Sequence, residues 1–200
     1  MSALIWLCGP SGVGKSTLAT ALGEGDARAL AAFGLERPPR VYVGRALASD
    51  GAPLCALLAD PAEPVVVKHQ YHYGTVVRGA AALAQTRLHR LALLWCAPAV
   101  YLERWAAKYP QLVERAAGPP DVLAHWISSA WPHVLSLHAA LVAGGGRAQV
   151  ELYDVTGPAL AIGPACVVGG CECPHVDAAA LSATMLALRD PWAMPGPSAA

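Results

Sequence analysis

Charged side chains are scarce in this sequence, and their two signs balance. Aspartate, glutamate, lysine and arginine make up 14% of the 200 residues, apolar residues make up 55%, and the formal net charge at pH 7 is zero. Disordered chains combine low hydrophobicity with high charge, so this composition excludes that class. The strong basic excess of a dedicated nucleic-acid-binding protein is also missing, although zero net charge still permits a local basic groove.

Long hydrophobic runs are missing as well. The longest, residues 91–102, is too short to span a bilayer, and Arg87, His89 and Arg90 interrupt the segment before it. The first six residues carry neither a basic region nor a cleavage site, so we expect no signal peptide, no membrane association and a cytoplasmic location. The six cysteines are then expected to be free thiols or metal ligands rather than disulfides.

Short apolar runs and helical patterns alternate along the chain. The runs predict β-strands at 4–8, 40–43, 64–68, 91–96 and 149–154, and the patterns predict helices at 15–22, 53–59, 75–86, 99–107 and 120–143. Pro132 should kink or split the longest helix, and the three glycines at 144–146 should end it. We therefore predict an α/β fold, a three-layer sandwich with a five-stranded parallel sheet and helices on both faces.

The predicted domain organisation is a single domain with an extension. Residues 1–157 form the core, with a lid region at about 104–120. Residues 158–200 form a Cys/Gly/Pro-rich extension of the same domain, with a helix at 176–189 and a mobile tail.

One motif indicates the class of chemistry. Eight residues fit the pattern G-x-x-x-x-G-K-[ST], namely Gly9, Pro10, Ser11, Gly12, Val13, Gly14, Lys15 and Ser16, and Thr17, which follows, is predicted to bind the nucleotide with them. In such a loop the backbone N–H groups surround phosphates, the lysine reaches the β- and γ-phosphates, and the Ser16 hydroxyl ligates Mg²⁺. A predicted strand before the motif and a predicted helix after it are the expected context, so we predict a P-loop NTPase-type fold that binds ATP with Mg²⁺.

The signatures of several P-loop classes are missing. The sequence has neither the N-K-x-D nor the D-x-x-G that a switch GTPase needs. An ATPase of the ABC or AAA⁺ type needs an acidic residue at the end of an apolar strand, and the strand near 65–67 ends in Lys68 instead. A small kinase is the class that remains.

Residues 3–157 resemble the thymidylate kinase and deoxynucleoside kinase group. Beyond the phosphate loop, the resemblance rests on residues 42–45 followed by Asp50 and Gly51, on 97–104, and on 152–156. It implies that Arg45 helps to bind and activate the transferred phosphate, that Arg104 belongs to the turn that opens the lid, and that 152–156 lies near the adenine pocket. Asp50 is the candidate acid or base, and Lys15 and Arg45 are the other predicted catalytic residues.

The segment after the third strand departs from that family. The family has an Asp-Arg pair there, and this chain has His69 and Gln70, followed by Tyr71 and His72. Because Gln70 lacks the charge that holds an acceptor phosphate, an acceptor with a bare hydroxyl is favoured. Phage kinases that phosphorylate hydroxymethyluracil in DNA form one such subgroup, and they supply the specific candidate: a modified pyrimidine in DNA, in the host cytoplasm. The aromatic strip could stack on a flipped base.

Each of these assignments has an alternative. Arg45 could be a surface arginine, Asp50 a helix cap, and His69 and His72 packed histidines. The cations that could form a lid over ATP could equally be solvated; they are Arg104, Lys108 and Arg115. Arg78 is the residue that could hold an acceptor phosphate if Gln70 does not. The acceptor could instead be a small metabolite, an antibiotic or a nucleoside monophosphate, and the chain could be a non-catalytic nucleotide-binding module.

The cysteines of the extension do not have the usual spacing of a zinc site. Cys166, Cys171, Cys173 and His175 follow the pattern C-x₄-C-x-C-x-H rather than paired C-x₂-C. We therefore expect free thiols there and no zinc. The sequence does not identify the oligomeric state, and a homodimer is left open.

Overall fold

In the part of the chain that the structure describes, a sheet of six strands forms the centre. The computed structural model describes residues 4–43, 62–68, 88–96, 98–113, 131–157 and 161–162. The strands are β1 (Leu4–Cys8), β2 (Arg40–Val43), β3 (Val65–Lys68), β4 (Leu88–Trp95), β5 (Arg147–Asp154) and β6 (Ala161–Ile162). They lie in the order β2-β3-β1-β4-β5-β6. The first five are parallel, and β6 is antiparallel to β5. The predicted parallel sheet is confirmed, but the predicted number of five strands omitted β6.

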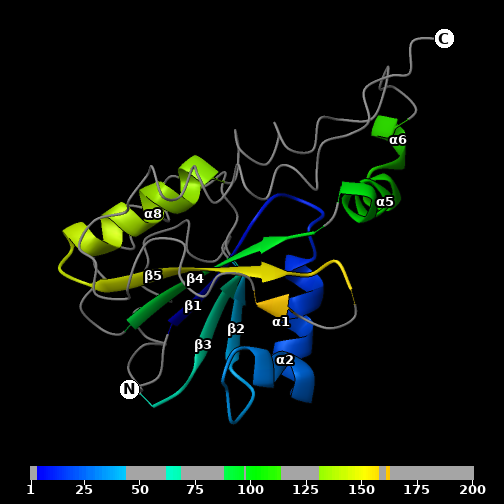
Figure 1. The fold of residues 1–200 in the computed structure, drawn as a ribbon. Helices are drawn as coiled ribbons and strands as arrows, with labels where there is room; N and C mark the ends of the chain where they lie inside the picture. The colour runs from blue at the N-terminus through cyan, green and yellow to red at the C-terminus, as the bar shows by residue number, and fades with distance from the viewer. Residues whose placement is uncertain are drawn as a thin grey trace.

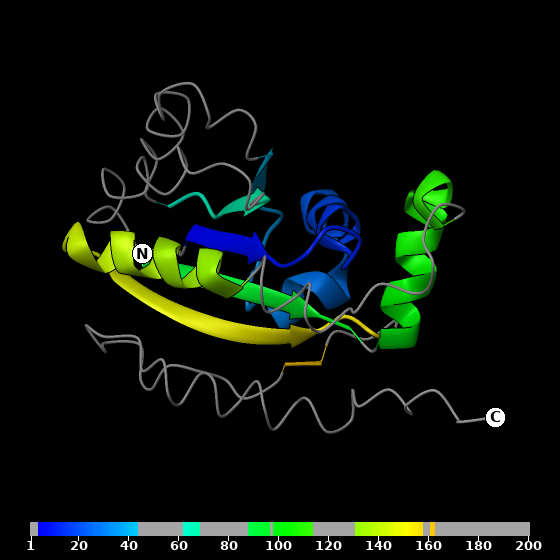
Figure 2. The same cartoon turned by 90° about the horizontal axis from the view of Figure 1, so that it is seen from above.

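Helices cover both faces of this sheet. The described helices are α1 (Lys15–Glu24), α2 (Ala27–Ala32), α5 (Pro98–Lys108), α6 (Pro110–Val113) and α8 (Trp131–Ala143). Figure 1 shows α1 and α2 on one face and α8 on the other, while α5 and α6 lie beyond the ends of the strands. The view from above in Figure 2 gives the same arrangement. In the described ranges, no helix has the length and apolar character needed to cross a membrane.

Alternation of side chains along the strands explains the two faces. Ile5 and Leu7 of β1 join the buried cluster that α1 and α2 complete with Leu18, Leu22 and Phe33. The residues between them on β1 point to the opposite face. There, α8 packs on β4 and β5 and buries Val134, Leu137 and Leu141. The sheet is thus covered by apolar side chains on both faces, as a parallel sheet requires.

The boundaries of several elements differ from the prediction. β4 begins at Leu88 and β5 at Arg147, both earlier than expected. α8 begins at Trp131, so Pro132 lies in its first turn, where proline is tolerated. The helix ends as predicted: Gly145 has φ 78°, and the Gly146 N–H donates to Leu141 O. The helices predicted at 53–59 and 75–86 lie outside the described residues.

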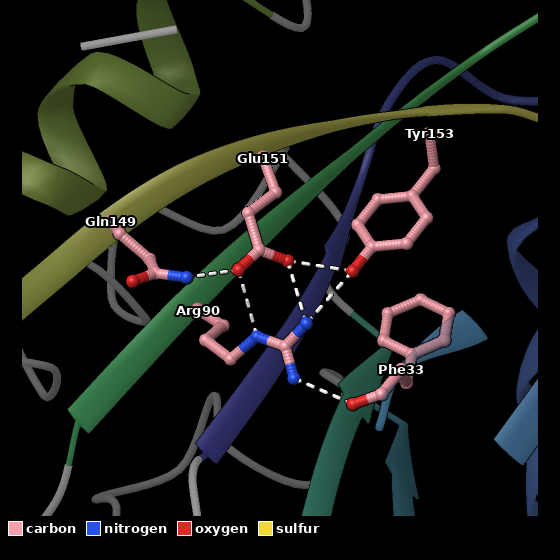
Figure 3. Close-up of polar contacts among 5 residues, drawn as sticks. All are labelled: Phe33, Arg90, Gln149, Glu151 and Tyr153. Carbon is pink, nitrogen blue, oxygen red and sulfur yellow. Dashed lines mark hydrogen bonds and ion pairs between the residues drawn. The ribbon is translucent and has the colours of Figure 1, made fainter. Parts of the chain in front are cut away.

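A buried polar network joins the middle of the sheet to the end of α2. The Arg90 guanidinium donates to both carboxylate oxygens of Glu151, at 2.8 Å each, and to Phe33 O at 2.7 Å. Tyr153 donates to Glu151 at 2.6 Å, and Figure 3 shows Gln149 completing the group. Burial opposes ionisation of Glu151, but the hydrogen bonds from Arg90 and Tyr153 hold its pKa below the ordinary value. This network links β4, β5 and the end of α2 through buried and half-buried polar side chains.

Candidate phosphate-binding site

The glycine-rich loop at 9–14 joins the carboxyl end of the central strand β1 to α1. Gly9 and Gly14 have φ of 138° and 113°, values that other residues rarely adopt. A Cβ atom at Gly9 would lie 2.9 Å from Leu94 O. The loop therefore follows the end of β4 so closely that only glycine fits. Ligands of open α/β sheets bind outside the carboxyl ends of the strands, which is where this loop lies.

The amino terminus of α1 is built to face an anion. Its N-cap residue is Gly14, which offers no side-chain cap, and its first turn has no acidic residue. The first N–H groups of a helix have no partner within the helix, and the helix dipole places partial positive charge there. A negatively charged group in front of this terminus would accept hydrogen bonds from these N–H groups and be attracted by the partial positive charge.

Helix α5 holds the loop from outside. Tyr101 donates its hydroxyl hydrogen to Ser11 O at 3.0 Å, and Arg104 Nη1 donates to Val13 O at 3.1 Å. In a trans peptide unit the C=O and the following N–H point in opposite directions, and the described residues have no cis peptide bond. The N–H groups of Gly12 and Gly14 are therefore directed away from α5. This orientation suits a loop whose N–H groups surround a phosphate.

Lys15 lies at the centre of the site. Its side chain is buried, and its Nζ donates to Pro10 O at 2.8 Å and to Gly9 O. The Lys15 pKa falls from 10.5 to about 8, mainly because the side chain is buried; the Cys8 thiol acts in the opposite direction, and the positive charges of Lys108 and Lys68 contribute to the decrease. A bound anion would favour the charged form and raise the Lys15 pKa.

All of the lysines in the sequence gather around this loop. The chain has only three, Lys15, Lys68 and Lys108. Lys68 Nζ donates to Ser16 Oγ at 3.1 Å, and Lys108 Nζ donates to Ser11 Oγ at 3.0 Å. In the described parts of the chain, the salt bridges are Arg40–Glu63 and Arg90–Glu151, so neither Lys68 nor Lys108 pairs with a described carboxylate. The site concentrates positive charge in a chain of zero net charge.

Arg104 connects the loop to the end of β5. Besides Val13 O, its guanidinium donates to Val155 O at 2.8 Å. A Cβ atom at Gly14 would lie 4.0 Å from Val155 Cγ2. The segment after β5, where Asp154 accepts a hydrogen bond from the Thr156 N–H at 2.8 Å, is therefore adjacent to the loop. Arg104 contacts backbone carbonyls and positions the loop, and its role in binding ATP remains a prediction.

The expected Mg²⁺ site is a poor fit for the residues described around it. Ser16 supplies a hydroxyl oxygen, but that oxygen already accepts from the Lys68 ammonium. Within the described ranges, no group of three His, Cys, Asp or Glu side chains is placed to hold a metal ion. Mg²⁺ prefers oxygen ligands that include carboxylates, and these residues provide an ammonium instead.

Many of the predicted residues lie outside the described ranges. These are Arg45, Asp50, His69, Gln70, Tyr71, His72, Arg78 and Arg115, together with Cys166, Cys171, Cys173 and His175. Their assignments remain predictions. Of the six cysteines, the structure describes Cys8 and Cys96, which are free and buried. Burial raises the pKa of Cys8 to about 12 and that of Cys96 to about 11.

The sequence analysis missed several residues of the site. Tyr101 was noted only within the predicted helix and the 97–104 segment, and Trp105 only within that helix, although a Cβ atom at Gly12 would lie 3.7 Å from Trp105 Cα. Lys68 was used only to exclude other ATPase classes. One signal could have identified it: a strand next to β1 in a parallel sheet ends at the same edge as β1. Leu7 is indeed in register with Lys68.

Comparison with known proteins identifies no family. No protein-family model matches the chain, and no curated protein matches it. Among solved structures, it is similar to a protein of Chloroflexus aurantiacus J-10-fl described as a "putative kinase", with 16% identity, 94% of each chain covered and a TM-score of 0.43. A likeness this distant establishes neither a family nor an activity.

Proposed function

We propose that this chain is an ATP-dependent phosphotransferase of the P-loop type, with an acceptor that presents a hydroxyl group. The observation that carries the proposal is the gathering of every lysine of the chain around the glycine loop, at Ser11 and Ser16 and on the loop carbonyls. A cluster of ammonium groups at a helix amino terminus needs an anion, and a triphosphate provides several negative charges along one chain of atoms.

The arrangement of the three lysines suits phosphoryl transfer as well as nucleotide binding. Phosphoryl transfer depends mainly on positioning and on positive groups around the transferred phosphate. Lys15 projects from the first residue of α1, while Lys68 and Lys108 come from β3 and α5. Three ammonium groups from three elements can contact different phosphate oxygens, and Arg104 and Tyr101 keep the loop in place around them.

The acceptor is proposed from the sequence. Gln70 in place of a phosphate-binding arginine favours a neutral hydroxyl, and the hydroxymethyl group of hydroxymethyluracil in DNA is the specific candidate. His69 or Asp50 would accept the hydroxyl proton, and Tyr71, His72 and Arg78 would contact the acceptor. The alternative hypotheses are a small-molecule kinase and a non-catalytic nucleotide-binding module.

Transfer of label from γ-labelled ATP tests the proposal. The acceptors are hydroxymethyluracil-containing DNA, plain DNA, free nucleosides, thymidine monophosphate and a metabolite panel. We expect label in an acceptor and a loss of about 10²- to 10³-fold in Lys15→Ala, with Arg28→Ala, on the surface of α2, as the folded control. Label in modified DNA alone supports hydroxymethyluracil in DNA as the acceptor. Label in a free small molecule supports a small-molecule kinase instead. ATP binding without any label would refute the transferase proposal.

A further inference from the structure

The position beside the Ser16 hydroxyl is where a P-loop protein of this type would hold a divalent cation. In this chain a positively charged side chain already lies there: Lys68 Nζ is 3.1 Å from Ser16 Oγ. Lys68 is the last residue of β3, and β3 is hydrogen-bonded to β1, with Leu7 in register with Lys68. The sheet therefore fixes the backbone of Lys68 at the edge where the phosphate loop begins.

An ammonium and a Mg²⁺ ion that share the Ser16 hydroxyl oxygen would repel one another. A Mg²⁺ ion on Ser16 Oγ would lie about 2 Å from that oxygen, and so within a few ångströms of Lys68 Nζ. The repulsion between the two charges would have to be offset by carboxylates. In the described ranges no carboxylate forms an ion pair with Lys68, and the charges that act on neighbouring Lys15 include both Lys68 and Lys108.

We propose that Lys68 takes the place of the divalent cation, so that nucleotide phosphates bind to the loop without Mg²⁺ and with the Lys68 ammonium beside Ser16. This inference rests on the proposed function, because it presupposes that the loop binds a nucleotide. The ammonium donates hydrogen bonds to the phosphates and supplies a counter-charge, in place of the oxygen coordination and charge that a divalent cation would supply.

The test compares ATP affinity in excess EDTA with ATP affinity in excess Mg²⁺. Binding is followed by calorimetry, or by tryptophan fluorescence, since Trp105 adjoins Gly12 of the loop. For the wild-type chain we expect the two dissociation constants to agree within about threefold. Lys68→Met should weaken binding in EDTA by about tenfold to a hundredfold, the effect of losing one charge-assisted hydrogen bond.

Two further variants sharpen the result. Lys68→Asp restores a carboxylate and should bind ATP only when a divalent cation is present, with Mn²⁺ detected on the complex by electron paramagnetic resonance. Arg28→Met removes one positive charge from the exposed surface of α2, at the far end of α1, and should leave both dissociation constants unchanged. Circular dichroism checks that each variant is folded; should Lys68→Met fail to fold, the wild-type comparison decides alone.

Several outcomes would overturn the inference. One is a wild-type affinity that Mg²⁺ strengthens by more than about threefold. Others are a folded Lys68→Met that binds ATP in EDTA as the wild type does, and a Lys68→Asp that binds equally well without metal. Absence of ATP binding in both conditions would instead refute the proposed function, and the inference would fall with it.

Discussion

Replacing Lys15 with methionine should stabilise the protein in the absence of ligand. The Lys15 pKa falls from 10.5 to about 8 in the folded protein, so the folded state disfavours the charged amine. Each tenfold change in the protonation equilibrium is worth about 1.4 kcal/mol, and the burial of this charge therefore costs about 3 kcal/mol at pH 7. Lys15→Met also loses the hydrogen bonds to Gly9 O and Pro10 O, and this loss offsets about 1–2 kcal/mol of the stability gained. Lys15→Met should thus be more stable by about 1–2 kcal/mol at pH 7.

The pH dependence of stability distinguishes removal of the buried Lys15 charge from a change in packing. A lysine with a lowered pKa destabilises the folded state fully below pH 8, and the penalty is relieved as pH rises from about 8 toward 10.5. Urea unfolding at pH 7 and pH 9.5 should therefore show the stability difference between Lys15→Met and the wild type falling by about 2 kcal/mol. Arg28→Met should show no such change. A Lys15→Met protein less stable than the wild type by the same amount at both pH values would refute the reasoning.

Three other perturbations test the fold around the site. Gly9→Ala places a Cβ atom 2.9 Å from Leu94 O, whereas Gly34→Ala, also at positive φ, meets nothing within 4 Å. Thermal unfolding should therefore show that Gly9→Ala loses more free energy of unfolding than Gly34→Ala, by more than about 1 kcal/mol. Equal losses of stability in the two variants would contradict the close approach of the loop to β4. Arg90→Met leaves Glu151 charged and 7% exposed, so urea unfolding should show a loss of about 3–5 kcal/mol, partly recovered by adding Glu151→Gln. Because burial raises the pKa of Cys8 to about 12, mass spectrometry should find Cys8 unmodified by iodoacetamide at pH 8 in the folded protein and modified in urea. Modification at similar rates in both states would exclude a buried thiol.

The sequence predicted what local patterns encode. β1, the glycine loop and α1 were predictable together because a buried apolar run, a phosphate-loop motif and a helical pattern follow one another within 24 residues. The end of α8 was predictable because glycine alone adopts the left-handed conformation at 145 without strain. Each of these features depends on neighbours in the sequence.

The features that were missed depend on distant residues. β4 was predicted to start at Leu91 because His89 and Arg90 are polar, yet His89 accepts from Trp6 Nε1 at 3.2 Å and Arg90 pairs with Glu151. β6 has two residues, and only its pairing with β5 makes it a strand. α2 has six residues, which is too short for a periodic apolar pattern, and Asp26 caps it by accepting from the Arg28 and Ala29 N–H groups.

The gathering of all three lysines at one loop makes the protein a natural subject for amine footprinting. Reagents that acylate primary amines react with uncharged, accessible amines, and Lys15, Lys68 and Lys108 are the only lysine amines that this sequence offers. Apart from the chain's own amino terminus, every site of acylation would thus lie around the phosphate loop. A single mass measurement, with and without a candidate ligand, would report on occupancy of this loop without any engineered label.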